Sequence, residues 1–109
     1  MIIARITMAA RPEKRKEVIQ TLLSLIEPTL LEKGCLSYQV LQNIEDEDVI
    51  ILLKEWKTRE DLDHHMRSDR FGVLLGTKIL LNEQLNIQIH TISHSEGIEA
   101  VHAARAKRT

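Results

Sequence analysis

Five consecutive aliphatic residues, Val49–Leu53, place the strongest constraint on how this chain folds. They open the segment Val49–Lys57, which has the composition of a β-strand, and an unbroken apolar strand needs cover on both faces. The chain has 109 residues, which fits one domain and leaves no room for a second core. We therefore expect part of the cover over Val49–Leu53 to come from a second copy of the chain.

Three further strands are predicted from alternation of apolar and polar residues. The pattern recurs in Ile2–Ala9, in Cys35–Gln42 and again over residues 85–90. The acidic stretch Glu45–Asp48 cannot be buried and is expected at the tip of a hairpin. The chain thus supplies four strands, two of which are joined by that tip.

The first helix is predicted to follow Pro12, a residue suited to a first helical turn. Pro28 should kink or end this helix, because its ring clashes with the preceding turn and it donates no hydrogen bond. One last turn is expected before Gly34, which can adopt the positive φ of a helix end. The apolar stripe is Val18, Ile19, Leu22, Leu23 and Ile26, and the last turn carries Leu30 and Leu31.

Two more helices are predicted between the third and fourth strands. Thr58 with Asp61 resembles a capping arrangement, and Ser68 followed by an acid marks a second helix start. The expected buried residues are Leu62, His65 and Met66 in the first of these helices, and Phe71, Leu74, Leu75 and Ile79 in the second.

The order β-α-β-β-α-α-β favours an α+β fold, with a four-stranded antiparallel sheet and helices on one face. Residues 1–92 form this domain, and residues 93–109 form a separate tail. Ile98, Val101 and Ala104 predict a short helix in the tail that is marginal alone in water. We expect it to pack on the body or on a partner subunit.

Charge and composition exclude several classes of function. A net charge of -1 and a pI near 6.5 argue against a nucleic-acid-binding protein. No apolar run approaches the roughly 20 residues that cross a bilayer, and the first residues do not resemble a signal peptide, so a cytoplasmic protein is expected. Cys35 is the only cysteine, which rules out an intrachain disulfide and a four-cysteine zinc site.

No motif for a metal or a nucleotide cofactor is present. The chain lacks G-x-G-x-x-G, the P-loop and G-x-S-x-G. Its histidines do not have the spacing of known metal-ligand motifs. Neither a metal nor a cofactor is therefore expected. The five histidines are His64, His65, His90, His94 and His102.

A set of residues in order along the chain resembles the antibiotic biosynthesis monooxygenase (ABM) family. The pattern is G-C-L-S-Y at residues 34–38, E-W at residues 55–56, then L-x-x-H ending at His65 and an aromatic residue at Phe71. The likeness covers roughly residues 2 to 92. It implies a dimeric ferredoxin-like α+β barrel, in which two sheets pack together and each subunit keeps a pocket between sheet and helices.

The same resemblance implies several activities. Members of the family include cofactor-independent oxygenases of phenols and quinols, haem-degrading enzymes, an isomerase of a signalling sugar and proteins with no known activity. The haem-degrading members carry Asn, Trp and His at positions that hold Ala4, His65 and Leu75 here. All three differ, which argues against haem degradation.

His65 is the leading catalytic candidate, because an imidazole can remove the proton of a phenol and so allow the anion to reduce dioxygen. A histidine packed in the core or at an interface is the structural alternative. Trp56, Tyr38, Arg5, Met66 and Phe71 are candidates for the substrate pocket, against simpler roles in packing or, for Arg5, in a surface ion pair. Glu55 is expected to pair with a surface cation, Cys35 to be a small buried residue, and His64 to face solvent.

Two functions follow from these candidates. The first is a homodimeric monooxygenase that converts a small aromatic quinol or phenol with dioxygen. The second is a non-catalytic dimer that binds a small metabolite or has a regulatory role, with an isomerase of the same family as a further alternative. Catalysis that depends on His65 distinguishes the first from the second.

Overall fold

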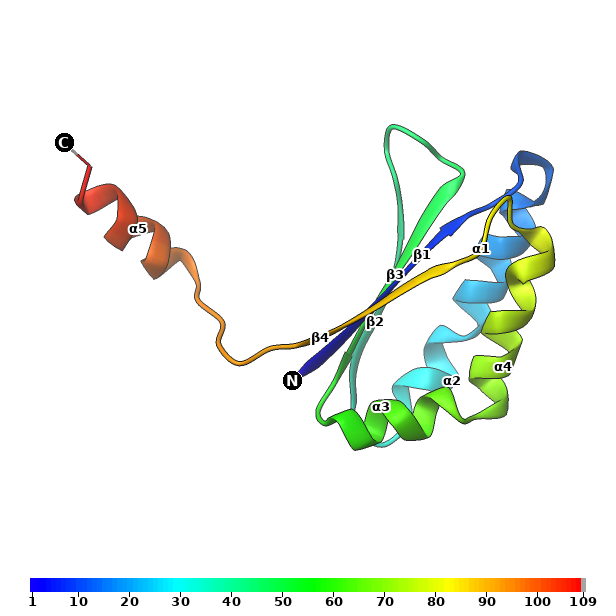
Figure 1. Ribbon diagram of the computed structural model, residues 1–109, viewed down its shortest axis with the longest axis horizontal. Coiled ribbons are helices and arrows are strands. Elements are labelled where there is room, and N and C mark those ends of the chain that lie inside the picture. Colours follow the sequence, from blue (N-terminus) through cyan, green and yellow to red (C-terminus); the bar gives the residue numbers. More distant parts are fainter. Residues whose placement is uncertain (109) are drawn as a thin grey trace.

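Four strands pair antiparallel in the order β2-β3-β1-β4 and form one sheet (Figure 1). In this computed structural model, which describes residues 1–108, the strands are β1 (Ile2–Ala9), β2 (Cys35–Gln42), β3 (Val49–Trp56) and β4 (Asn86–Thr91). This arrangement confirms the predicted α+β fold of ferredoxin-like type. The last strand begins one residue later than the sequence predicts.

The helices of the body all lie on one face of the sheet, as Figure 1 shows. Thr58 and Ser68 begin α3 and α4 as predicted, because their side-chain oxygens accept hydrogen bonds from the backbone N–H groups of Asp61 and Phe71. Gly34 has a φ of 80° and lies between the first two helices and β2. The helices are α1 (Arg15–Ser24), α2 (Ile26–Leu30), α3 (Arg59–Met66) and α4 (Asp69–Gly76), with 3₁₀ turns at Pro12–Lys14 and Thr77–Leu80.

The core lies between the helices and the inner face of the sheet. Alternation in β1 and β3 directs every second residue inward, so that Ile6, Ile50 and Leu52 are at most 1% exposed. The opposite, outer face carries Val49, Ile51 and Leu53, which are only half-buried. No element of residues 1–108 packs over that face. Within this part of the chain, β3 is therefore covered on one face only, whereas the sequence predicts cover on both.

Helix α1 ends at Ser24, and α2 starts at Ile26, so the break falls before Pro28 rather than at it. The reason is that Pro28 has no N–H to donate to the carbonyl of Ser24, four residues earlier. The stripe predicted for this helix is also partly wrong. Leu23 is 51% exposed, because it follows Leu22, the centre of the buried face, by about 100° around the helix.

Four other apolar residues named in the predicted helices are exposed, Leu30, Leu31, Leu75 and Ile79, and so is Leu36 within the alternating pattern of Cys35–Gln42. Leu36 sits at a β-bulge between Cys35 and Ser37, which interrupts the alternation of β2. Leu75 lies beside the buried stripe of α4. Ile79 belongs to the 3₁₀ turn, where three residues per turn change the phase of the apolar pattern. Leu31 lies beyond the end of α2 and is 85% exposed.

The C-terminal helix α5 (Ile98–Ala106) stands away from the body at the end of an extended segment (Figure 1). Ile98 is 60% exposed and Val101 is 49% exposed. The helix therefore does not pack on its own body, which was one of the two expected positions. The division of the chain into residues 1–92 and 93–109 stays a prediction. None of the helices in residues 1–108 has the length and apolar character to cross a membrane.

Candidate active site

His65 is held by a carboxylate inside the protein. It lies on the inward side of α3 and is 1% exposed, and its Nδ1 is 3.0 and 2.9 Å from the two carboxylate oxygens of Glu32. Glu32 belongs to the turn between α2 and β2, 33 residues away in the chain. Because a carboxylate only accepts hydrogen bonds, Nδ1 carries the proton and donates it to Glu32. This leaves the lone pair of His65 Nε2 as the hydrogen-bond acceptor of the ring.

Lys54 lies on the other side of the imidazole. Its Nζ is 3.0 Å from His65 Nε2, and the lysine is only 2% exposed. Lys54 reaches this position because it follows Ile50 and Leu52 on the inner face of β3 and shares that face with Trp56. An ammonium donates and never accepts, so the neutral imidazole that donates to Glu32 accepts from Lys54.

Burial sets the protonation of both basic groups. Burial is the main cause that lowers the pKa of Lys54 to about 8, against a smaller opposing effect of the Glu32 carboxylate. The pKa of His65 is also lowered, first by burial and second by the charge of Lys54, while Glu32 opposes the shift. At neutral pH, therefore, the site holds a neutral imidazole between a carboxylate and an ammonium.

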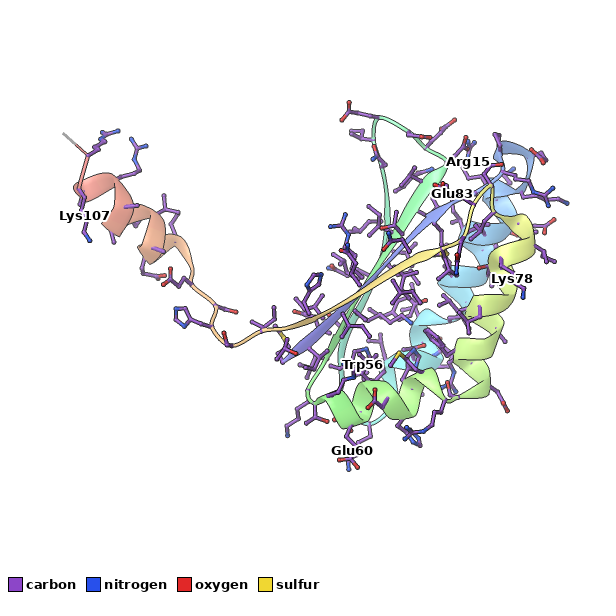
Figure 2. The ribbon with its side chains drawn as sticks, viewed as in Figure 1. Arg15, Trp56, Glu60, Lys78, Glu83 and Lys107 are labelled. Atoms are coloured by element: carbon purple, nitrogen blue, oxygen red, sulfur yellow. The ribbon has the colours of Figure 1, made fainter. Side chains whose placement is uncertain are left out.

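Three aromatic rings enclose this chain of hydrogen bonds. The ring of Trp56 lies 4.7 Å from that of His65, and Phe71 meets His65 edge-on at 5.4 Å. The ammonium of Lys54 lies 5.2 Å from the ring centroid of Tyr38 and 5.1 Å from that of Phe71. Figure 2 shows Trp56 between the sheet and the helices. All the aromatic residues of the chain thus surround the His65–Lys54 pair.

Arg70 connects the site to the surface. Its guanidinium lies 2.7 Å from Oε2 of Glu32, and its side chain is 35% exposed, whereas that of Glu32 is 13% exposed. Two hollows in residues 1–108 lie away from this site. One, at the outer end of α3, is lined by His64 and Lys57, and an apolar one lies between α4 and β4 beside Leu75 and Ile87. The side chains around His65 are packed against one another, since the imidazole is 1% exposed and the nearest aromatic rings lie 4.7 and 5.4 Å from it.

The structure brings together most of the residues predicted for the site. Trp56, Tyr38 and Phe71 contact the His65–Lys54 pair as described, and Met66 is half-buried between the two apolar clusters of the core. The Tyr38 hydroxyl is directed away, because it donates to the carbonyl of Leu22 at 3.4 Å. Burial raises the pKa of this hydroxyl to about 12.

Arg5 does not join this group. It occupies an outward position of β1 and is exposed on the opposite face of the sheet, since successive side chains of a strand alternate between faces. Glu55 also faces outward, where it accepts a hydrogen bond from Ser37 at 2.5 Å. Cys35 is half-buried rather than buried, and burial raises the pKa of its thiol.

Glu32, Lys54 and Arg70 were not predicted from the sequence. A signal for Lys54 exists, because it stands at an inward position of β3 between Leu52 and Trp56. The sequence around Glu32 and Arg70 offers no comparable sign, since their role depends on the path of the chain between distant elements. Within the described part of the chain, no group of three or more His, Cys, Asp or Glu side chains is arranged to hold a metal ion.

The ferredoxin-like α+β domain agrees with the class of protein that the sequence pattern resembles. The family model described as antibiotic biosynthesis monooxygenase matches residues 1–74, and the chain belongs to this ABM family.

The chain is also similar to solved and curated proteins. A conserved protein from Methanosarcina mazei Go1 is 36% identical, with a TM-score of 0.77 over 82% of this chain and 89% of its own. The protein named "Putative monooxygenase YcnE", from Bacillus subtilis strain 168, is 26% identical over 80% of this chain and 93% of its own. The uncharacterized protein sll1783 of Synechocystis is 26% identical over 79% of this chain, which spans only 59% of that longer relative.

Proposed function

We propose that the protein is a cofactor-independent monooxygenase that oxidises a small phenol or quinol with dioxygen. The observation that carries this proposal is the buried His65, whose Nδ1 is held by Glu32 so that Nε2 is the proton acceptor. Membership of the ABM family supports it. For a phenol the reaction balances as phenol plus dioxygen giving quinone plus water, with one oxygen atom entering the ring.

His65 acts as the general base in this scheme. Once the substrate hydroxyl replaces the Lys54 ammonium at Nε2, this nitrogen takes the proton of the hydroxyl, and the Glu32 carboxylate stabilises the imidazolium that forms. The resulting phenolate can pass an electron to dioxygen, which the neutral phenol cannot do. The aromatic rings exclude water, which strengthens each polar contact within the site.

Entry of a substrate requires the packed side chains to move. Met66 is the residue best suited to this, because it is half-buried where the two core clusters meet and its unbranched side chain adapts readily. The substrate ring then lies among Trp56, Tyr38 and Phe71. A flat aromatic compound matches these walls better than an extended polar one.

Oxygen uptake tests the proposed function directly. We expect the purified protein, without added metal or cofactor, to consume dioxygen with at least one member of a panel of naphthoquinols, anthrones and flavonols, above the rate of autoxidation. The measurement uses an oxygen electrode together with the absorbance of the quinone product. An absence of uptake across the panel would contradict the proposal for these substrate classes.

The packed side chains around His65 favour a second candidate, a non-catalytic dimer that binds a small metabolite. Such a protein would quench or shift the fluorescence of Trp56 on binding the same compounds and would consume no dioxygen. Because the chain has a single tryptophan, the signal reports on this site alone. Fluorescence and oxygen uptake measured on one sample therefore separate binding from turnover.

A homodimer is part of the proposal. Val49, Ile51 and Leu53 remain half-buried on an outer sheet face that no element of residues 1–108 covers. A second sheet placed on this face would bury them, and a nine-residue helix such as α5 is marginal in water unless it also packs on the partner. In that arrangement the predicted tail, residues 93–109, would pack on the partner subunit.

We expect sedimentation equilibrium to show a dimer at micromolar concentration, and Ile51→Lys to weaken its association at least tenfold, because a charge would be buried between two sheets. The matched control is Val73→Lys, which places the same charge on α4 at a position that is 53% exposed. A monomeric wild-type protein would contradict the dimer, and equal effects of the two substitutions would place the interface elsewhere.

A further inference from the structure

The buried network around His65 contains more positive than negative groups. Lys54 and Arg70 are cations, Glu32 is the one carboxylate in hydrogen-bond contact with the network, and the imidazole between them is neutral. Arg70 lies on the outer side of Glu32 and is 35% exposed at its side chain, so it is this cation that pairs with the carboxylate directly. Lys54 contacts Glu32 only through the ring of His65 and is left without an adjacent anion.

The ammonium of Lys54 also has unused hydrogen-bonding capacity. It carries three N–H donors, and within residues 1–108 its hydrogen-bond partner is His65 Nε2 alone. Its other neighbours are the faces of Tyr38 and Phe71, which attract a cation and offer no hydrogen-bond acceptor atom. A lysine that is 2% exposed with two free donors is costly to keep, because water is not there to satisfy them.

Trp56 supplies a second observation in the same place. Its indole Nε1 is buried and has no hydrogen-bond partner among the residues that the structure describes. Trp56 lies two positions after Lys54 on the same face of β3, and its ring stacks on His65. Two kinds of unpaired donor, an ammonium and an indole N–H, therefore occur in one aromatic cluster.

We propose that Lys54 binds the anionic oxygen of the substrate, and that the ligand class of this site is a planar aromatic oxyanion such as a phenolate or enolate. When the packed side chains move apart, the ring of such a ligand lies between the aromatic residues, and its charged oxygen takes the free donors of Lys54. Because this role presumes the proposed function, His65 removes the proton and Lys54 holds the anion that results.

The probe for this role is 4-nitrophenol, since its phenolate absorbs visible light and its neutral form does not. At a pH about one unit below the pKa of the free probe, we expect the wild-type protein to bind it with the phenolate band increased. 4-Nitroanisole, which has nearly the same shape and no ionisable hydroxyl, should bind at least tenfold more weakly. Lys54→Met should remove both the band and this preference, whereas the exposed Lys57→Met should change neither.

The wild-type protein alone can overturn the proposal. It fails if 4-nitrophenol does not bind, if the bound probe stays neutral, or if the anisole binds equally well. The proposal also fails if the folded Lys54→Met protein still binds the phenolate. Lys54→Arg keeps the charge and should therefore restore part of the phenolate band. Phenolate binding without oxygen uptake would refute the monooxygenase and leave the anion site in place. Oxygen uptake that Lys54→Met does not change would refute the role of Lys54 and leave the monooxygenase in place.

Discussion

Replacing His65 with glutamine will reduce the rate of oxygen uptake about 10²–10⁴-fold, which is the usual contribution of a general base. Glutamine is the informative substitution, because its amide N–H can donate to Glu32 and its carbonyl can accept from Lys54, as the imidazole does. The variant therefore keeps both hydrogen bonds and loses only the ability to take a proton. Initial rates with the best substrate of the panel measure the effect.

His64→Gln is the matched control for this change. His64 is the neighbour of His65 on α3 and is exposed, so its loss should leave the rate unchanged. The pH profile gives a second check, since only the neutral imidazole acts as a base. Because burial and Lys54 lower the pKa of His65 below its usual 6.5, the acid limb of the profile should have its midpoint below pH 6.5. A wild-type rate for His65→Gln would assign His65 to packing.

The fold could be predicted from the sequence because its main signals are local. The alternation in β1 and the caps at Thr58 and Ser68 depend on residues that are near one another in the chain, and all were confirmed. Helix faces were less certain, because periodicity gives an apolar stripe but not the surface against which it packs. Leu23 and Leu75 each lie next to a buried residue and are nevertheless exposed.

The candidate site could be predicted only in part. His65 was identified because it follows Leu62 by one helical turn and so faces inward. The residues that set its chemistry come from other elements: Glu32 lies 33 residues earlier, and Lys54 is 11 residues earlier on a strand. Their meeting depends on how α3 crosses β3 and the turn after α2, which no short-range pattern contains. The sequence suggested a lone histidine where the structure has a hydrogen-bonded chain.

Lys54→Met will make the protein more stable while it abolishes phenolate binding. A shift of the Lys54 pKa from 10.5 to about 8 corresponds to about 3 kcal/mol of cost for burying the charged form. Loss of the hydrogen bond to His65 Nε2 offsets about 1–2 kcal/mol of the gain. The net increase in the free energy of unfolding is therefore about 1–2 kcal/mol, or roughly 5–10 °C in the midpoint of thermal unfolding.

The pH dependence of this difference identifies its cause. The folded protein binds the Lys54 proton less tightly than the unfolded chain, so the cost is fully present below pH 8 and is relieved as the pH rises toward 10.5. The stability gap between Lys54→Met and the wild type should accordingly narrow between these values in circular dichroism melts. The exposed Lys57→Met should stay within about 0.5 kcal/mol of the wild type throughout. A less stable Lys54→Met protein would instead mean that Lys54 serves the fold, because a lysine kept for packing contributes stability, whereas one kept for binding an anion costs it.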